Sequence, residues 1–109
     1  MRTVAGSPKP IVTTGFVLVE VLDATCSVLL RQRAVQFVNR LVKDPEVIIV
    51  PVSEELLHQG MSLYTDRSDK AWSLTDCISF SVMNRFGITD ALTADHHFEQ
   101  AGYRALLKA

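Results

Sequence analysis

The stretch Ala91–Gly102, ALTADHHFEQAG, places one acid and two histidines directly after an apolar run. Asp95 stands where a strand is expected to end and a helix to begin. Aspartate is a favoured helix N-cap, because its side chain accepts a hydrogen bond from the first turn. A carboxylate is also a ligand for hard divalent cations. The position alone leaves N-cap and metal ligand open as alternatives for Asp95.

The adjacent residues His96 and His97 raise the alternative of a zinc site. Neighbouring side chains on a helix point about 100° apart, so we expect the two imidazoles not to share an ion. Zinc also needs further nitrogen or sulfur ligands, and His58, Cys26 and Cys77 are not spaced to supply them. We therefore do not predict a histidine zinc site. A role for His97 beside a scissile phosphate or a carboxylate stays open.

Two further acids are candidates for chemistry. Asp76 lies three residues after Ser73, which is a variant capping box with a shorter acid than usual. The residue types alone favour this structural role for Asp76. Glu20 lies on the polar stripe of an otherwise apolar helix, where an acid is usually solvated. An acid buried among the valines there would need a partner.

Composition bounds the class of protein. The 109 residues are 48 % hydrophobic and 21 % charged, with a formal net charge of -1. These values predict a single globular domain, 1–109, without a broad basic surface for duplex DNA. We expect no membrane span, a cytoplasmic location and two buried free thiols. The sequence has no Gly-rich phosphate loop and no GxSxG elbow, which argues against nucleotide-binding and serine-hydrolase sites.

Short β-branched or apolar runs alternate with amphipathic stretches along the chain. This order predicts an α/β fold with a short parallel sheet between helices, and ligands in such sheets gather at the carboxyl ends of the strands. The run 47–52 is continuously apolar, as expected for a strand buried on both faces. The expected strands are 11–13, 47–52, 91–94 and 103–107, and the expected helices are 15–30, 33–43, 53–64, 73–86 and 96–101. The residues expected to face inward on these helices include Phe37, Met61, Tyr64 and Phe86.

Three segments resemble the PIN-domain family, which includes the toxin ribonucleases of toxin–antitoxin pairs. They occur in the family's order and span nearly the whole chain. Each segment alone is a weak signal, and their combination on an alternating α/β pattern is more specific. The segments are IVTTGFVLVE at 11–20, DKAWSLTDCISF at 69–80 and ALTADHHFEQAGY at 91–103.

The resemblance implies a PIN-like three-layer sandwich and an endoribonuclease that cuts single-stranded RNA with Mg²⁺ or Mn²⁺. Glu20, Asp76 and Asp95 match the family's second, third and fourth acidic positions, so it assigns them catalytic and metal-binding roles. Such ions activate water and stabilise charge on the phosphate and the leaving oxygen. Thr75 and Thr93 would supply hydroxyls near the metal or the substrate.

The resemblance also implies partners, namely single-stranded RNA, an antitoxin protein and a second copy of the chain. The cations that we weigh as contacts to RNA phosphates are Arg31, Arg67, Lys70 and Arg85. The alternative for each is the usual role of a surface cation, which is solvation.

The chain departs from the family at its beginning. Family members start with a strand that carries an aspartate, followed by a helix pair, before the segment that begins here at Ile11. Met1–Pro10 contains no acid, so we expect an N-terminally incomplete domain with weak or no activity. Three accounts stay open: a start codon assigned too late, a second copy filling the gap, and Arg2–Ala5 acting as the strand. The alternative function is a non-catalytic PIN fragment that binds RNA or protein, or dimerises.

Overall fold

The first half of the molecule is a parallel strand pair joined by two helices. The computed structural model describes residues 11–107. Its first four elements are β1 (Ile11–Thr14), α1 (Gly15–Ala24), α2 (Val28–Lys43) and β2 (Val47–Val50). Ile11 lies opposite Val47 and Thr14 opposite Val50 in the parallel ladder. The helical crossover therefore brings the carboxyl ends of both strands to the same edge.

The second half contains three helices and a second parallel ladder. Its elements are α3 (Glu54–Asp66), α4 (Leu74–Phe86), β3 (Asp90–Ala91), α5 (His96–Gln100) and β4 (Arg104–Ala105). β3 pairs with β4 in parallel. The N–H of Arg104 donates to the carbonyl of Thr89 at 2.8 Å, and the N–H of Leu106 donates to the carbonyl of Ala91 at 2.9 Å.

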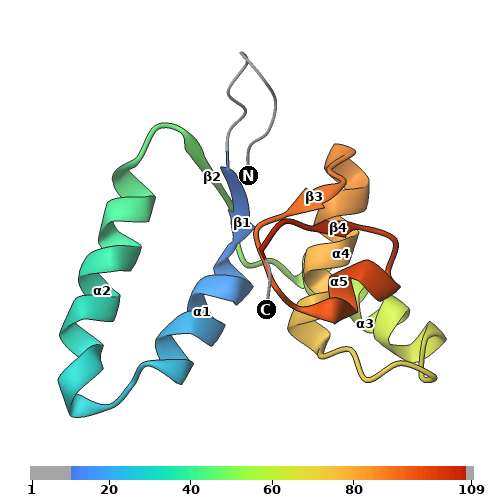
Figure 1. Ribbon diagram of the computed structural model, residues 1–109, viewed down its shortest axis with the longest axis horizontal. Helices are drawn as coiled ribbons and strands as arrows, with labels where there is room; N and C mark the ends of the chain where they lie inside the picture. The colour runs from blue at the N-terminus through green and yellow to red at the C-terminus, as the bar shows by residue number, and fades with distance from the viewer. Residues whose placement is uncertain (1–10, 108–109) are drawn as a thin grey trace.

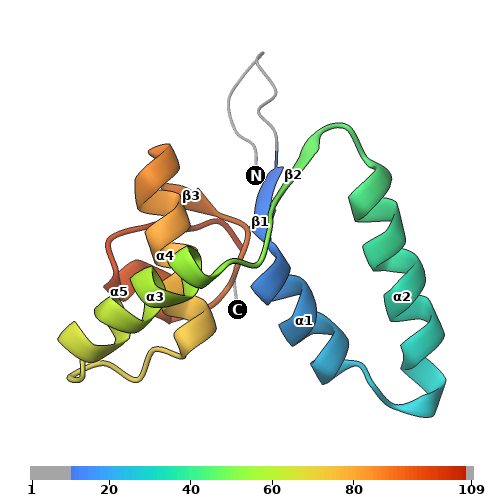
Figure 2. The same cartoon turned by 180° about the vertical axis from the view of Figure 1, so that it is seen from behind.

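The strands β1 and β2 lie between two groups of helices. The α1–α2 pair lies on one side and the α3–α4–α5 group on the other (Figure 1), and the view from behind shows the same division (Figure 2). The expected α/β class with parallel pairing is confirmed. Within residues 11–107 the pairing forms two separate two-stranded ladders rather than one continuous sheet.

Most of the apolar core lies where α3 packs along α4. Leu56, Ile78 and Val82 are buried there, and Val12, Phe16 and Val50 from the first half pack against them. Gly60 allows the close approach of the two helices, because a Cβ atom at this position would collide with the side chain of Ile78. The first half is thus attached to the core through β1, β2 and the start of α1.

A second buried cluster holds α5 against α4. The ring of Phe80 lies edge-on to Trp72, with centroids 5.0 Å apart, and edge-on to Phe98, with centroids 4.8 Å apart. Trp72 Nε1 donates to Gln100 Oε1 at 3.0 Å, and the Tyr103 hydroxyl donates to the Phe80 carbonyl at 3.0 Å. These contacts fix the five residues of α5 on the surface of α4.

Threonine and serine cap the two helices that are expected to begin at residues 15 and 53. The Oγ1 of Thr14 accepts the N–H of Val17 at 3.1 Å, and the Oγ of Ser53 accepts the N–H of Leu56 at 3.1 Å. Such caps satisfy N–H groups that have no partner inside the helix. At the other end of α4, Gly87 adopts φ 67°, a conformation that favours glycine.

Two predicted helix boundaries are wrong. The expected helix 15–30 ends at Ala24, and α2 begins at Val28 instead of residue 33. The hydroxyl of Thr25 donates to the Val21 carbonyl at 2.7 Å, and the Arg31 guanidinium donates to the Cys26 carbonyl at 2.9 Å. These side chains satisfy carbonyls at the junction and so stabilise the break, which hydrophobic periodicity does not reveal.

Several burial predictions for the helices and for β2 are also wrong. Four side chains that were expected to face inward on helices, and one on β2, are about half exposed. The Cys26 thiol is also exposed, whereas Cys77 is buried as expected. The expected strand 47–52 ends at Val50, and its outer face is open rather than covered. The exposed fractions are 49 % for Phe37, 48 % for Met61, 52 % for Tyr64, 50 % for Phe86 and 45 % for Ile48.

Two further expectations concern a strand at the N-terminus and the absence of a membrane span. The proposed strand Arg2–Ala5 lies outside the described residues. Among residues 11–107, no helix has both the length and the apolar character needed to cross a bilayer.

Candidate functional site

Asp76 forms the capping box that the sequence predicts at the start of α4. Its N–H donates to Ser73 Oγ at 3.0 Å, and its Oδ2 accepts the N–H of Ser73 at 3.2 Å. The side chain is 16 % exposed. Because Oδ2 makes the capping bond, Oδ1 has no hydrogen-bond partner within residues 11–107.

Asp95 is the N-cap of α5. Its Oδ1 accepts the N–H of His97 at 2.9 Å, and its own N–H donates to Thr93 Oγ1 at 3.1 Å. The capping role is therefore confirmed. The hydroxyl of Thr93 thus holds the backbone of Asp95, and its expected role near the metal or the substrate stays a prediction.

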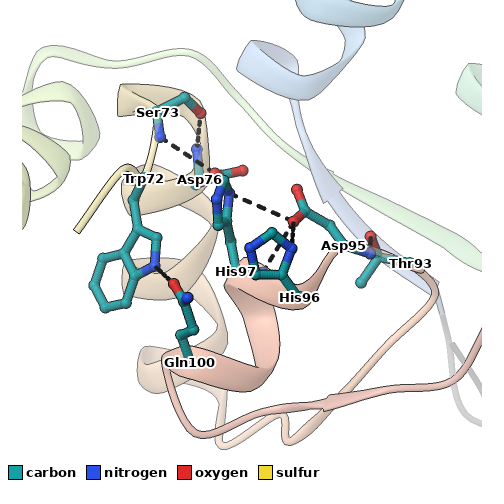
Figure 3. A network of polar contacts seen from close by, with 8 residues as sticks. All are labelled: Trp72, Ser73, Asp76, Thr93, Asp95, His96, His97 and Gln100. Carbon is teal, nitrogen blue, oxygen red and sulfur yellow. Dashed lines mark hydrogen bonds and ion pairs between the residues drawn. The ribbon is translucent and has the colours of Figure 1, made fainter. Parts of the chain in front are cut away.

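His97 lies between these two carboxylates. Its Nδ1 is 3.2 Å from Asp76 Oδ2 and 3.4 Å from Asp95 Oδ1. Figure 3 shows the imidazole between an acid from α4 and an acid at the start of α5. The side chain is 22 % exposed, so the contact is largely shielded from bulk water. The open alternative of His97 beside a carboxylate is confirmed, with two carboxylates instead of one.

The two histidine rings lie close together at the start of α5. Their centroids are 4.5 Å apart with planes inclined by 54°. His96 Nδ1 lies 3.8 Å from Asp95 Oδ1, the same oxygen that His97 approaches. One ligand atom from each of Asp95, His96 and His97 falls within 4.8 Å of the others, and the described residues contain no other such group.

Glu20 is not part of this arrangement. It is exposed on α1, and within the described residues it makes no hydrogen bond or ion pair with Asp76 or Asp95. The structure thus brings together two of the three acids. Thr75 is half-buried on the first turn of α4, and its hydroxyl makes no hydrogen bond to either of the two acids.

The donor atoms at this corner fit a divalent cation. Two carboxylates converge on one imidazole, and each carboxylate keeps one oxygen without a hydrogen-bond partner within residues 11–107. Carboxylate oxygens suit Mg²⁺ and Mn²⁺, and imidazole nitrogen suits transition ions. The aromatic cluster of Trp72, Phe80 and Phe98 positions α5, and it therefore sets the distance between the acids.

The comparison with solved structures identifies the same arrangement of elements. VapC20 of Mycobacterium tuberculosis, a toxin that cleaves the sarcin–ricin loop, matches with a TM-score of 0.76 and 24 % sequence identity. The match covers 89 % of this chain and 74 % of VapC20. This chain has a PIN-like fold. No family model matches it, and no curated protein matches it.

Three of the four cations considered for RNA binding already have partners. Arg67 contacts Asp69 at 3.0 Å, lies over the Trp72 ring, and holds the pKa of Asp69 below its usual value through their hydrogen bond. Arg85 contacts Glu55 at 2.9 Å. Arg31 donates to a backbone carbonyl. Lys70 makes no side-chain hydrogen bond or ion pair in the described part of the chain, and its charge adds to the lowering of the Asp69 pKa.

A largely apolar cavity of about 570 Å³ separates the two ladders of the PIN-like fold. Val12 and Thr14 of β1 line one side of the cavity, and Ala91 and Leu92 line another. The cavity also extends along α4 to Met83, so it lies beside the core rather than at the two acids.

Proposed function

We propose that the protein is a Mg²⁺- or Mn²⁺-dependent endoribonuclease of the PIN type that cuts single-stranded RNA. The observation that carries this proposal is the convergence of Asp76 and Asp95 on His97 from two different helices. Resemblance to PIN toxins at three segments and a fold shared with an RNA-cleaving toxin support it. On the same grounds we propose a toxin whose partner is an antitoxin protein.

The two capped acids would hold the ion with their carboxylate oxygens, which have more lone pairs than the capping bonds use. Asp76 Oδ2 and Asp95 Oδ1 are engaged by backbone N–H groups, which orients each carboxylate before an ion binds. When bound, the ion activates water and stabilises negative charge on the phosphate. His97 holds the two carboxylates close to each other, because its ring contacts both.

Glu20 enters the proposal as the third acid, on the family resemblance. It lies on α1 without contact to the other two. Glu20→Gln tests this role separately. If Glu20 holds metal, Glu20→Gln loses activity, as the separate variants Asp76→Asn and Asp95→Asn do. Unchanged activity would remove Glu20 from the site and leave the other two in place.

The decisive experiment is a single-stranded RNA cleavage assay with Mn²⁺, beside Asp95→Asn. Asparagine is as good an N-cap as aspartate, so this variant keeps the helix start and loses the charge. We expect a drop of roughly a hundredfold or more, since even outer partners of metal ligands contribute 10- to 100-fold. Asp66→Asn is the matched control, because Asp66 is an exposed acid without a contact in residues 11–107. Equal activity of wild type and Asp95→Asn would refute the catalytic assignment.

A second candidate function is a binding or dimerisation module, and the surface of α2 favours it. Val28 is 93 % exposed and Leu29 is 88 % exposed. The helix carries Arg31, Arg33, Arg40 and Lys43 and no acid. Exposed apolar patches of this kind mark interaction sites, so we propose that the chain forms a homo-oligomer through α2. Light scattering that reports a monomer over a wide concentration range would contradict this.

A further inference from the structure

We propose that His97 and His96 are themselves metal ligands, which together with Asp95 and Asp76 form a mixed imidazole–carboxylate centre. This centre would select a first-row transition ion over Mg²⁺. The inference deepens the proposed function and rests on it for the place of the ion. It differs from an all-carboxylate site in both ligands and metal preference.

The distances between donor atoms already suit an ion. Two ligands that each lie about 2.1 Å from a tetrahedral metal are about 3.4 Å from each other. His97 Nδ1 lies 3.2 Å from Asp76 Oδ2 and 3.4 Å from Asp95 Oδ1. His96 Nδ1 lies 3.8 Å from Asp95 Oδ1. One ligand atom from each of Asp95, His96 and His97 thus lies within 4.8 Å of the others, and Asp76 Oδ2 adjoins this group at the His97 nitrogen.

The rigidity of the surroundings favours binding by these residues. α5 is held on α4 by the Trp72–Gln100 hydrogen bond and by the contact of Phe98 with Phe80. Asp95 is fixed by its capping bond and by Thr93, as Figure 3 shows. Because the donors are held before binding, little conformational entropy is lost when an ion enters.

The donor types decide which ion is preferred. Mg²⁺ takes oxygen ligands and retains several waters, so a neutral imidazole adds little to its binding. Transition ions accept imidazole nitrogen, and their affinities for a given site rise from Mn²⁺ to Cu²⁺ in the usual series. His97 and His96 would therefore strengthen Mn²⁺ binding without a matching gain for Mg²⁺.

The test measures Mn²⁺ binding to the full chain without RNA, by electron paramagnetic resonance or calorimetry. The variant is His97→Asn, because asparagine places an amide near the position of Nδ1 and keeps a hydrogen-bond donor between the carboxylates. The matched control is His58→Asn, since His58 is an exposed histidine on α3 with no contact in residues 11–107. The single tryptophan, Trp72, reports whether each variant is folded.

We expect wild type and His58→Asn to keep Mn²⁺ bound against a hundredfold excess of Mg²⁺. We expect His97→Asn to bind Mn²⁺ at least tenfold more weakly, with Mg²⁺ affinity unchanged, and His96→Asn to show a smaller loss. Tight Mn²⁺ binding that Asp95→Asn abolishes and His97→Asn leaves intact would refute the histidine ligands while keeping the proposed metal centre. Absence of Mn²⁺ binding to a folded wild type that binds Mg²⁺ would refute the histidine ligands, and absence of binding of both ions would refute both proposals.

Discussion

The α1–α2 pair and the α3–α4–α5 group are built from similarly apolar helices with different environments. α4 buries Cys77, Ile78, Phe80, Val82 and Met83 against its neighbours. In α2, the one buried residue is Ala34, while long apolar side chains face outward. An apolar face alone therefore does not predict burial, because a helix is covered only where another element meets it.

This difference has a consequence for stability and for function. The packed group carries the core and sets the geometry of Asp76, Asp95 and His97. The α1–α2 pair is attached through β1, β2 and the start of α1, so changes on its outer face should leave the site intact. Each of the following predictions tests this separation, from the largest effect to the smallest.

The largest contrast is expected in thiol labelling. Cys26 is exposed at the α1–α2 junction and Cys77 is buried in α4. Burial raises the pKa of the Cys77 thiol, and the nearby Asp76 charge adds to this, so less of the reactive thiolate forms at a given pH. We expect Cys26 to label roughly a thousandfold faster or more, because Cys77 reacts mainly after unfolding. Mass spectrometry of the Cys26→Ser and Cys77→Ser variants measures each rate, and similar rates would contradict the packing described for α4.

Truncation of a core side chain should remove a large part of the protein's free energy of unfolding. Ile78 is 1 % exposed between Leu56 and Val82. Ile78→Ala removes buried methyl groups and leaves a cavity, so we expect a loss of about 2–5 kcal/mol in the free energy of unfolding. Val42→Ala on α2, at 61 % exposure, is the control and should change stability by less than about 0.5 kcal/mol. Urea titration followed by Trp72 fluorescence measures both, and a comparable loss for Val42→Ala would show that α2 is also packed.

The close approach of α3 and α4 predicts an unusual response to Gly60→Ala. Glycine to alanine inside a helix ordinarily stabilises by about 1 kcal/mol. Here the added methyl group would collide with Ile78, so we expect destabilisation by about 1–3 kcal/mol from overpacking. The double variant Gly60→Ala/Ile78→Ala removes the colliding Cγ1 atom and should therefore lose less stability than the two single losses added together. A stabilised Gly60→Ala protein would mean that the two helices are further apart than described.

The smallest effect on folding is expected at the outer face of α2. Leu29→Gln replaces an exposed leucine with a residue of similar helix propensity. We expect its free energy of unfolding, measured at low protein concentration, to change by less than about 0.5 kcal/mol. If α2 is the oligomer interface, light scattering should report a shift towards monomer at high concentration. A large loss of stability at low concentration would instead indicate that Leu29 packs within the chain.

The candidate site was predictable in part from residue types and spacing. The capping roles of Asp76 and Asp95 depend on contacts within three residues, and both predictions are confirmed. The position of His97 between the two acids was not predictable, because Asp76 is 21 residues away in the sequence. The assignment of Glu20 depends on the family resemblance and stays a prediction.

The sequence by itself determined the local features of this protein. Ser53, Ser73, Gly87 and the β-branched runs begin and end elements through bonds between near neighbours, whose geometry depends little on the rest of the chain. Only the tertiary structure decided which apolar faces are covered and which candidate metal ligands come together. The packing of Phe98 on Phe80 brings α5 to α4, and this packing turns two separate helix caps and a histidine into one candidate metal centre. Such a contact joins distant segments through the balance of burial and chain entropy, which no short stretch of sequence contains.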